Sequence, residues 1–391
     1  MKAGIALCSD NWWVEGEKAY FCPADIGVLL CADLNKKSLD MVAQIPDCVF
    51  RQYRANAYCL KFGNSIFCVP YNGKEICYYN IEKSEWGKIE IGYKDRLMVC
   101  LERQEKDNEI IWLLEYQGRV VYQVDLKEKV LKKKYSLSQD MHIFTGNYVQ
   151  VQHNLYCVAG KNIYVINTKK DCGINQYELS DVQAALYTIC YDGANFWLSG
   201  EDNEIYIWNP TQGVIKRIAG FLEKFDSFSL KRNIIADPIP RFSYSVSLGE
   251  NVWYIPLQGN IPIIYIDKRY YKIRVFDILE EIETEESLLK RGTAFKYILL
   301  YIRHNRYIGL YSCKNQIVWE IDTDELCVEK KEYHFSDGSI YDLAYAYHRT
   351  IGMLSEGYSM DEEVYSILMK SNEKDLSHFR KEVGKEIYLK M

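Results

Sequence analysis

A repeated unit of short apolar segments constrains the fold of this 391-residue chain more than any other feature of its sequence. Each unit contains a turn, an apolar run, a Gly or Asn turn, and a further apolar run that ends in Asp or Asn. The second copy, residues 58–62, 65–71, 74–81 and 86–91, consists of four strand-like runs that are joined by turns such as Gly63-Asn64. We count about seven such copies.

The second run of every copy carries an aromatic residue in register. These residues are Tyr20, Phe67, Trp112, Tyr156, Trp197, Trp253 and Tyr307. A period of roughly 40 to 55 residues is typical of propeller blades. A lone four-stranded sheet cannot bury both faces, whereas sheets stacked around an axis can. The sequence therefore predicts an all-β fold, a β-propeller of about seven four-stranded blades, with six or eight blades as alternatives.

The repeats assign residues 1–358 to the propeller and leave residues 359–391 as a C-terminal helical extension. Ser359 followed by Glu362 matches a capping box, and the apolar residues after it fall near helical spacing. We expect this helix to pack on the propeller.

Two further strand-like runs and two long connections interrupt the repeats. Residues 340–348 and 351–354 could pair with residues 4–8 to close the ring, or could begin an eighth blade. Residues 221–240 and 279–291 lengthen the connections before the sixth and seventh copies, and long loops in a compact domain are often functional.

Composition and charge limit the compartment and the class of partner. A formal net charge of -6 offers no field for a phosphate backbone, so no nucleic acid partner is expected. The apolar stretch near the N-terminus is too short for a secretory signal, and no apolar run is long enough to span a membrane. Thirteen cysteines, an odd number without an export signal, indicate free thiols in the cytoplasm.

One segment resembles a known repeat family. The run Asp192-Gly193-Ala194-Asn195-Phe196-Trp197 resembles kelch-type and related propellers, in which a Gly/Asn turn precedes an aromatic-apolar strand. The resemblance implies the propeller fold and covers roughly residues 10–335. The paired glycines of kelch repeats and the Gly-His and Trp-Asp marks of WD40 blades are absent, so no family function transfers.

The spacing of the cysteines allows two interpretations. Cys59, Cys68 and Cys77 are nine apart, and two-residue turns place them opposite one another on three strands; Cys22 and Cys31 repeat the interval. Such neighbours can hold a metal or form a strained disulfide, but they also serve as small buried side chains. We favour packing, because neither a CxxC pair nor a histidine at ligand spacing accompanies them. We expect neither a metal nor a cofactor.

The predicted ligand-binding face lies where the inner strand of each blade begins. Arg or His with nearby Tyr recurs there, in a set made of Arg51, Tyr53, Arg54, Tyr93, Asp95, Arg96, His142, Arg241, Tyr244 and Arg291. Arg offers a fixed fork for carboxylate or phosphate, and Tyr a rigid amphipathic contact. In the alternative interpretation each Arg has a structural role and only bridges neighbouring blades.

The sequence favours a non-enzymatic scaffold that holds a protein or peptide on this face, because it contains no recognisable catalytic motif. The alternative is a carbohydrate-directed protein, a lectin or a glycan-active enzyme, for which an anionic small molecule or glycan would be the ligand. Such an enzyme would need two neighbouring carboxylates. Asp95 or Glu15 meeting a second carboxylate beside Arg96 would favour it.

Overall fold

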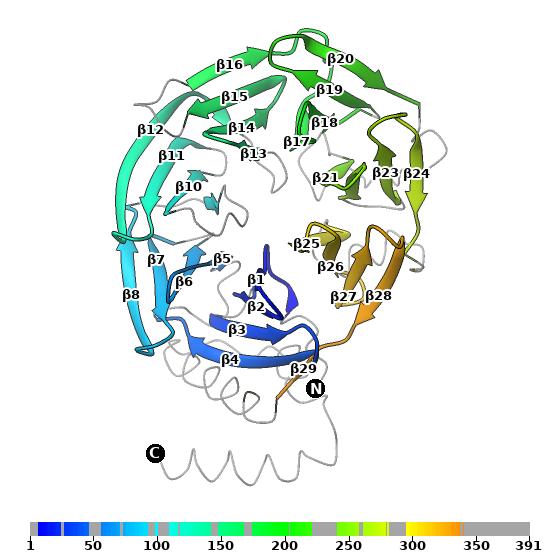
Figure 1. Cartoon of the computed structure of the whole chain (residues 1–391). Helices are drawn as coiled ribbons and strands as arrows, with labels where there is room; N and C mark the ends of the chain where they lie inside the picture. Colours follow the sequence, from blue (N-terminus) through cyan, green and yellow to red (C-terminus); the bar gives the residue numbers. More distant parts are fainter. Residues whose placement is uncertain are drawn as a thin grey trace, which may run out of the picture.

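The structure, a computed structural model, is a ring of seven β-sheets around a central axis (Figure 1). It describes residues 7–24, 27–46, 56–70, 73–92, 98–100, 109–115, 118–141, 148–167, 174–202, 204–220, 241–257, 261–278, 280, 295–336 and 339. Within each sheet the strands follow one another in chain order from the axis outward, and the first four strands pair antiparallel with their neighbours. Each sheet is therefore one propeller blade.

The strand bounds follow the repeat. Blade 1 contains β1 (Trp13–Glu15), β2 (Lys18–Phe21), β3 (Val28–Asp33), β4 (Ser38–Gln44) and, as an outer fifth strand, β29 (His334–Phe335). Blade 2 contains β5 (Asn56–Phe62), β6 (Ser65–Pro70), β7 (Glu75–Asn80) and β8 (Glu85–Glu90). Blade 3 contains β9 (Met98–Cys100), β10 (Ile110–Glu115), β11 (Gly118–Asp125) and β12 (Val130–Met141).

The remaining blades have four strands each. Blade 4 contains β13 (Tyr148–Val151), β14 (Asn154–Ala159), β15 (Asn162–Asn167) and β16 (Ile174–Glu178). Blade 5 contains β17 (Leu186–Tyr191), β18 (Phe196–Gly200), β19 (Ile205–Asn209) and β20 (Gly213–Ile218). Blade 6 contains β21 (Phe242–Leu248), β22 (Asn251–Pro256), β23 (Ile263–Asp267) and β24 (Ile273–Phe276). Blade 7 contains β25 (Tyr297–Arg303), β26 (Tyr307–Ser312), β27 (Ile317–Asp322) and β28 (Cys327–Lys331).

The prediction of a seven-bladed all-β propeller is confirmed. All seven predicted aromatic residues lie on second strands, but only six of them share one register, opposite the residue two before the Asp or Asn that ends the third strand. Tyr307 is instead opposite Asp322, and Gly309 takes the aligned position in blade 7. The expected C-terminal helix, residues 359–391, lies outside the described residues.

In most blades the Asp or Asn that ends the third strand caps the turn that follows it. Asp33, for example, accepts hydrogen bonds at Oδ1 from the backbone N–H groups of Asn35 and Lys36. Side chains at the same place in other blades do likewise: Asn80, Asp125, Asn209, Asp267 and Asp322. A short acceptor that bonds to the backbone two or three residues later stabilises a tight turn, so the chain repeats it.

The hydrophobic core consists of layers between neighbouring blades. Between blades 6 and 7, Trp253 stacks on Tyr265 and packs edge-on against Phe276, in a cluster that also contains Leu299 and Leu310. Comparable layers lie between the other neighbours. A blade is therefore apolar on both faces, and its stability depends on the blades beside it.

The ring closes between blades 7 and 1, where the chain crosses the gap after Lys331, so that residues 327–335 form two strands, β28 and β29. β29 then pairs in parallel with β4, with His334 opposite Ser38. Across the same gap the Trp12 N–H donates to the Leu300 carbonyl oxygen at 2.7 Å. Leu7 and Cys8 are in no strand, and residues 340–354 lie outside the described residues.

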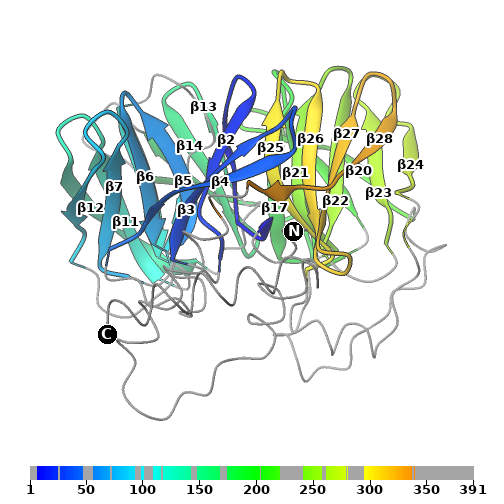
Figure 2. The same ribbon diagram turned by 90° about the horizontal axis from the view of Figure 1, so that it is seen from below.

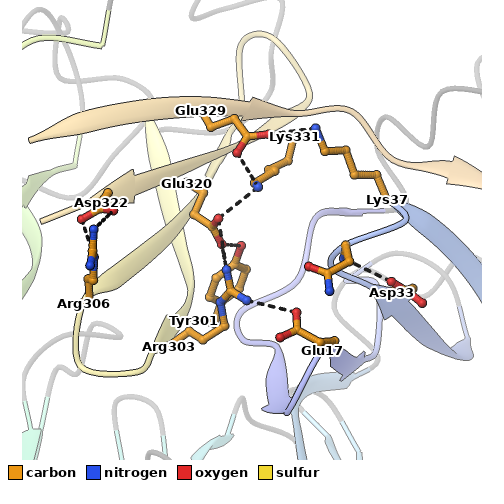
Figure 3. A network of polar contacts seen from close by, with 11 residues as sticks. Glu17, Asp33, Lys37, Tyr301, Arg303, Arg306, Glu320, Asp322, Glu329 and Lys331 are labelled. Carbon is orange, nitrogen blue, oxygen red and sulfur yellow. Dashed lines mark hydrogen bonds and ion pairs between the residues drawn. The ribbon is translucent and has the colours of Figure 1, made fainter. Parts of the chain in front are cut away.

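A buried polar network, which we call the seam network, ties blade 7 to blade 1 (Figure 3). Its centre is Glu320 on β27, which is 6 % exposed. Glu320 accepts a hydrogen bond from Tyr301 Oη at 2.8 Å and pairs with Arg303 at 3.2 Å and Lys331 at 3.1 Å. Arg303 reaches on to Glu17 of blade 1 at 3.3 Å.

Gly309 allows this contact. It sits between Tyr301 and Glu320 in the strand register, and a Cβ there would lie only 2.4 Å from the Tyr301 ring. The Tyr301 ring crosses the backbone of β26 at Gly309, and its hydroxyl reaches Glu320 on β27.

Candidate functional site

The strands of every blade run between two rims of the ring, seen edge-on in Figure 2. One rim, which we call the turn face, is where the chain turns from the first strand of a blade to the second and from the third to the fourth. On it most turns are short, such as residues 63–64, 81–84, 210–212 and 249–250, with residues 101–109 as the longer exception. We call connection face the opposite rim, where second strands lead to third strands and each blade leads to the next.

The connection face has the longest connections of the ring. Residues 45–55, 219–241 and 277–296 each leave an outer strand and enter the inner strand of the next blade at this rim. The predicted ligand-binding residues were assigned to this face because in the sequence they precede or begin inner strands. Eight of them lie outside the described residues: Arg51, Tyr53, Arg54, Tyr93, Asp95, Arg96, His142 and Arg291.

Arg241 is the predicted site cation that the structure describes. It directly precedes β21 and its carbonyl oxygen accepts the Leu257 N–H at 3.0 Å. Its Nε is buried and has no hydrogen-bond partner among the described residues. Burial lowers the pKa of the Arg241 guanidinium. A cation that has lost water without gaining a bond to its Nε is costly, and an incoming acceptor would offset that cost.

Tyr244, the other described residue of the predicted set, is part of the core. It is 1 % exposed and packs between blades 6 and 7 with Trp253 and Tyr297. Tyr244 therefore packs blade against blade. The sequence placed it three residues after Arg241 but could not show that the strand turns its ring inward.

A group of carboxylates on blade 5 was not among the predicted site residues. Glu201 and Asp202 follow β18 at the connection face, where carboxylates in a turn are usually exposed to solvent. Asp202 is instead half-buried, and Tyr206 Oη lies 2.6 Å from its Oδ2. Tyr206 Oη also lies 2.7 Å from Glu204 Oε2, while Glu204 Oε1 pairs with Arg217. The only sequence signal was three acids within four residues.

The packing of the β18–β19 turn against blade 4 explains this burial. Tyr206 belongs to the cluster between blades 4 and 5, with Val158 and Leu186. Gly200 brings the turn close to the incoming chain, because a Cβ there would lie 2.3 Å from the Ala185 carbonyl oxygen. The Glu201 N–H donates to that same oxygen at 3.0 Å.

The two carboxyls on Tyr206 have pKa values shifted in opposite directions. Burial, followed by the negative charge of Glu204, raises the pKa of Asp202. The hydrogen bond from Arg217 lowers the pKa of Glu204. Carboxyls that differ in this way exist in different protonation states over a range of pH.

The cysteine ladder exists as predicted and serves packing. Cys59 is directly opposite Cys68, and Cys68 is opposite Cys77. These three and Cys22 are buried in the cluster between blades 1 and 2. Burial raises the pKa of the Cys59 thiol, and of Cys31 to about 11. Within the described ranges no group of three or more His, Cys, Asp or Glu is placed to hold a metal.

We expect these thiols to be unreactive in the folded protein. Because Cys22, Cys59, Cys68 and Cys77 are buried out of reach of water and reagent, an alkylating reagent should leave them unlabelled, while exposed Cys327 reacts readily. Mass spectrometry of peptides after a short pulse of iodoacetamide measures this difference. Equal labelling of Cys59 and Cys327 in native buffer would contradict the packing interpretation; labelling of both in denaturant is the control.

Glu15, one of the two residues named for the carbohydrate alternative, has a lysine as its ion-pair partner in the part of the chain that the structure describes. It ends β1 at the turn face and pairs with Lys61 of blade 2. Asp95 and Arg96 lie outside the described residues. In the part of the chain that the structure describes, no helix is long and apolar enough to cross a membrane.

The ring and its two unequal rims define a seven-bladed β-propeller. No protein-family model matches the sequence, and no curated protein does. Among solved structures, the chain is similar to virginiamycin B lyase from Staphylococcus aureus, with 11% identity, a TM-score of 0.55, and coverage of 80% of this chain and 95% of that chain. A catalytically inactive variant of that lyase with quinupristin gives 10% identity and a TM-score of 0.53, over 80% and 96% of the two chains.

A streptogramin B lyase gives 13% identity and a TM-score of 0.51, over 84% of this chain and 97% of that chain. Identities this low show the fold alone. The comparisons therefore support a seven-bladed propeller in general and do not single out the kelch family.

Proposed function

We propose that this propeller is a non-enzymatic binding scaffold that holds a protein or peptide partner on its connection face. The observation that carries the proposal is the asymmetry of the two rims. The three longest connections between strands, residues 45–55, 219–241 and 277–296, all begin and end at the connection face. A rigid ring that concentrates chain length on one rim is how repeat folds commonly build a recognition surface.

The chemistry at this rim supports an anionic group on the partner. Arg241 contributes a guanidinium with a buried Nε that lacks a hydrogen-bond partner among the described residues. Arg54 and Arg96 precede inner strands in the same way. Guanidinium groups bind carboxylates through two parallel hydrogen bonds, so acidic side chains or a C-terminal carboxylate of a peptide suit this face.

The proposal also places the protein in the cytoplasm. None of the ten cysteines whose side chains the structure describes forms a disulfide with another of them, as is usual in a reducing compartment.

The proposed face is tested by charge removal on each rim. The triple variant R54A/R96A/R241A should lose a partner that the wild-type protein captures from native lysate, with a drop of at least about tenfold in the recovered amount if each arginine contributes about 0.5–1 kcal/mol. The control is K36A/K83A/R269A, which removes the same charge from exposed positions of the turn face. Circular dichroism checks that both variants fold.

Two outcomes would contradict the proposal. Retention of every captured protein by R54A/R96A/R241A would exclude the arginines as the recognition element. Equal loss with the turn-face control would show that capture depends on net charge alone.

A further inference from the structure

Three oxygen atoms on blade 5 lie in a row at hydrogen-bond distance. Tyr206 Oη is central, 2.6 Å from Asp202 Oδ2 and 2.7 Å from Glu204 Oε2. Both separations are those of good O–H···O bonds. Two full hydrogen bonds in such a row need two protons, and the phenol supplies only one.

The second proton would lie on one of the two carboxyls. With both carboxylates ionised, Tyr206 could donate to one, and its oxygen lone pair would face the negative oxygen of the other at contact distance. The tyrosine cannot resolve this by ionising, because burial and both neighbouring carboxyls raise its pKa far above the usual value. One protonated carboxyl gives both contacts a full hydrogen bond, whereas a single phenol proton would have to be shared between two carboxylates.

Asp202 is the better holder of that proton. Glu204 receives a charged hydrogen bond from Arg217, which stabilises its carboxylate. Asp202 Oδ1 is buried and has no hydrogen-bond partner among the described residues. The free energy cost of burying an unbonded oxygen is far smaller when the carboxyl is neutral than when it is a charged carboxylate.

The surroundings of Asp202 do not supply a nearby compensating cation. The charged groups that act on it are Glu204 and Arg217. The Tyr206 hydroxyl and the Glu204 backbone N–H also bond to the Asp202 carboxyl and lower its pKa, but burial outweighs them and the net shift is upward. The neighbouring Glu201 is occupied by the Tyr187 hydroxyl at 2.9 Å. From blade 4, the hydrophobic cluster that contains Tyr206 includes Val158, Ile163 and Leu179, with Tyr156 and Tyr177 partly buried against it.

We propose that Asp202 is a proton-binding site of the folded propeller and that its proton orders the β18–β19 turn at the connection face. With the proton bound, Asp202 donates to Tyr206, which donates to Glu204, and the row is complete. When the proton leaves, one of the two contacts becomes repulsive and a buried negative oxygen remains without a partner. The turn then loosens. That such loosening regulates partner binding rests on the proposed function.

The sign of the pH dependence follows from linkage. The folded-state pKa of Asp202 is raised above the ordinary aspartate value, so the folded state holds this proton more tightly than the unfolded chain does. The stabilisation is complete below the unfolded pKa. It is lost as the pH rises from there through the folded pKa, and above the folded pKa the turn stays in its looser state.

The proton is measured directly in the free protein. Carbon-13 NMR of selectively labelled aspartate side chains, titrated upward from acidic pH, should show one carboxyl carbon that ionises at higher pH than the other aspartates. That resonance should be absent in D202N. In E204Q it should shift to lower pH, because the charge that opposes ionisation of Asp202 is gone. E201Q, which removes an adjacent charge outside the row, is the matched control and should shift it less.

A second measurement tests the order of the turn. Amide hydrogen exchange of peptides covering residues 197–210 should match between wild type and D202N at low pH, and should become faster in the wild type as the pH rises through the titration of Asp202. Comparison at equal pH removes the intrinsic pH dependence of exchange.

Either of two results would overturn the inference. If Asp202 ionises at the same pH as the other aspartates, the folded protein does not hold the extra proton. If hydrogen exchange of the turn is the same in the wild type and in D202N at every pH, the proton does not order the turn. Because both measurements use the protein without a partner, they stand or fall independently of the proposed binding function.

Discussion

Replacement of Glu320 by alanine is expected to lower the free energy of unfolding by about 3 kcal/mol. Glu320 is the shared acceptor of Tyr301, Arg303 and Lys331 in the seam network, and all four side chains are nearly buried. Its loss leaves a buried hydroxyl without its acceptor and two cations short of a partner. The effect stays at the low end for a buried ion pair, because Arg303 keeps Glu17 and Lys331 keeps Glu329.

Chemical denaturation followed by tryptophan fluorescence measures this change. Asp324→Ala is the control, since the Asp324 carboxylate is 60% exposed and contacts Arg306 only at 3.5 Å. An exposed pair of this kind contributes about 0.5 kcal/mol or less. Equal losses in the two variants would show that burial adds nothing to the seam network.

Replacement of Trp12 by alanine should lower the free energy of unfolding by about 3–5 kcal/mol. Trp12 is completely buried where the last blade meets the first. Its ring stacks on Phe21 with centroids 4.2 Å apart, and packs against Tyr333 at 5.4 Å and Tyr301 at 5.9 Å. Alanine would leave a cavity among three aromatic rings that the rigid β-sheets on either side cannot collapse to fill.

The matched control is Trp86→Ala on the outer strand β8. Trp86 is only partly buried and packs on Tyr79 at 5.1 Å, so its removal should cost markedly less. A Trp12→Ala protein as stable as Trp86→Ala would contradict the seam as a main contributor to stability. Because Trp12 touches Tyr301, the double variant with Glu320→Ala should deviate from additivity.

Prediction succeeded where the controlling interactions are local. Blade boundaries could be read from the sequence because strands alternate in short runs and because an Asp or Asn, such as Asp33 or Asp267, caps the turn two residues later. The motif at Asp192 has the same basis: its carboxylate accepts the Asn195 N–H at 2.7 Å and the Trp197 indole N–H at 2.6 Å. Because these hydrogen bonds stabilise a turn, the motif can occur in propellers that have no function in common.

The candidate site was predicted less completely. The Arg and Tyr pattern located Arg241 at the start of an inner strand, but it also selected Tyr244, which is core. The carboxyls of Asp202 and Glu204 were overlooked, since three acids in a turn look solvated until a neighbouring blade covers them. Burial on this scale depends on the contact between blades 4 and 5, which a single repeat does not encode.

Local residue patterns were thus enough to define the blade, its turns, the aromatic register of six blades and the cysteine ladder. The way the ring closes was decided only in three dimensions, because it joins His334 to Ser38 and Arg303 to Glu17 across most of the chain. The protonation of Asp202 was likewise decided only in three dimensions. Pairing along a strand is a property of neighbours in sequence, whereas closure and desolvation arise only when distant blades pack together and exclude water.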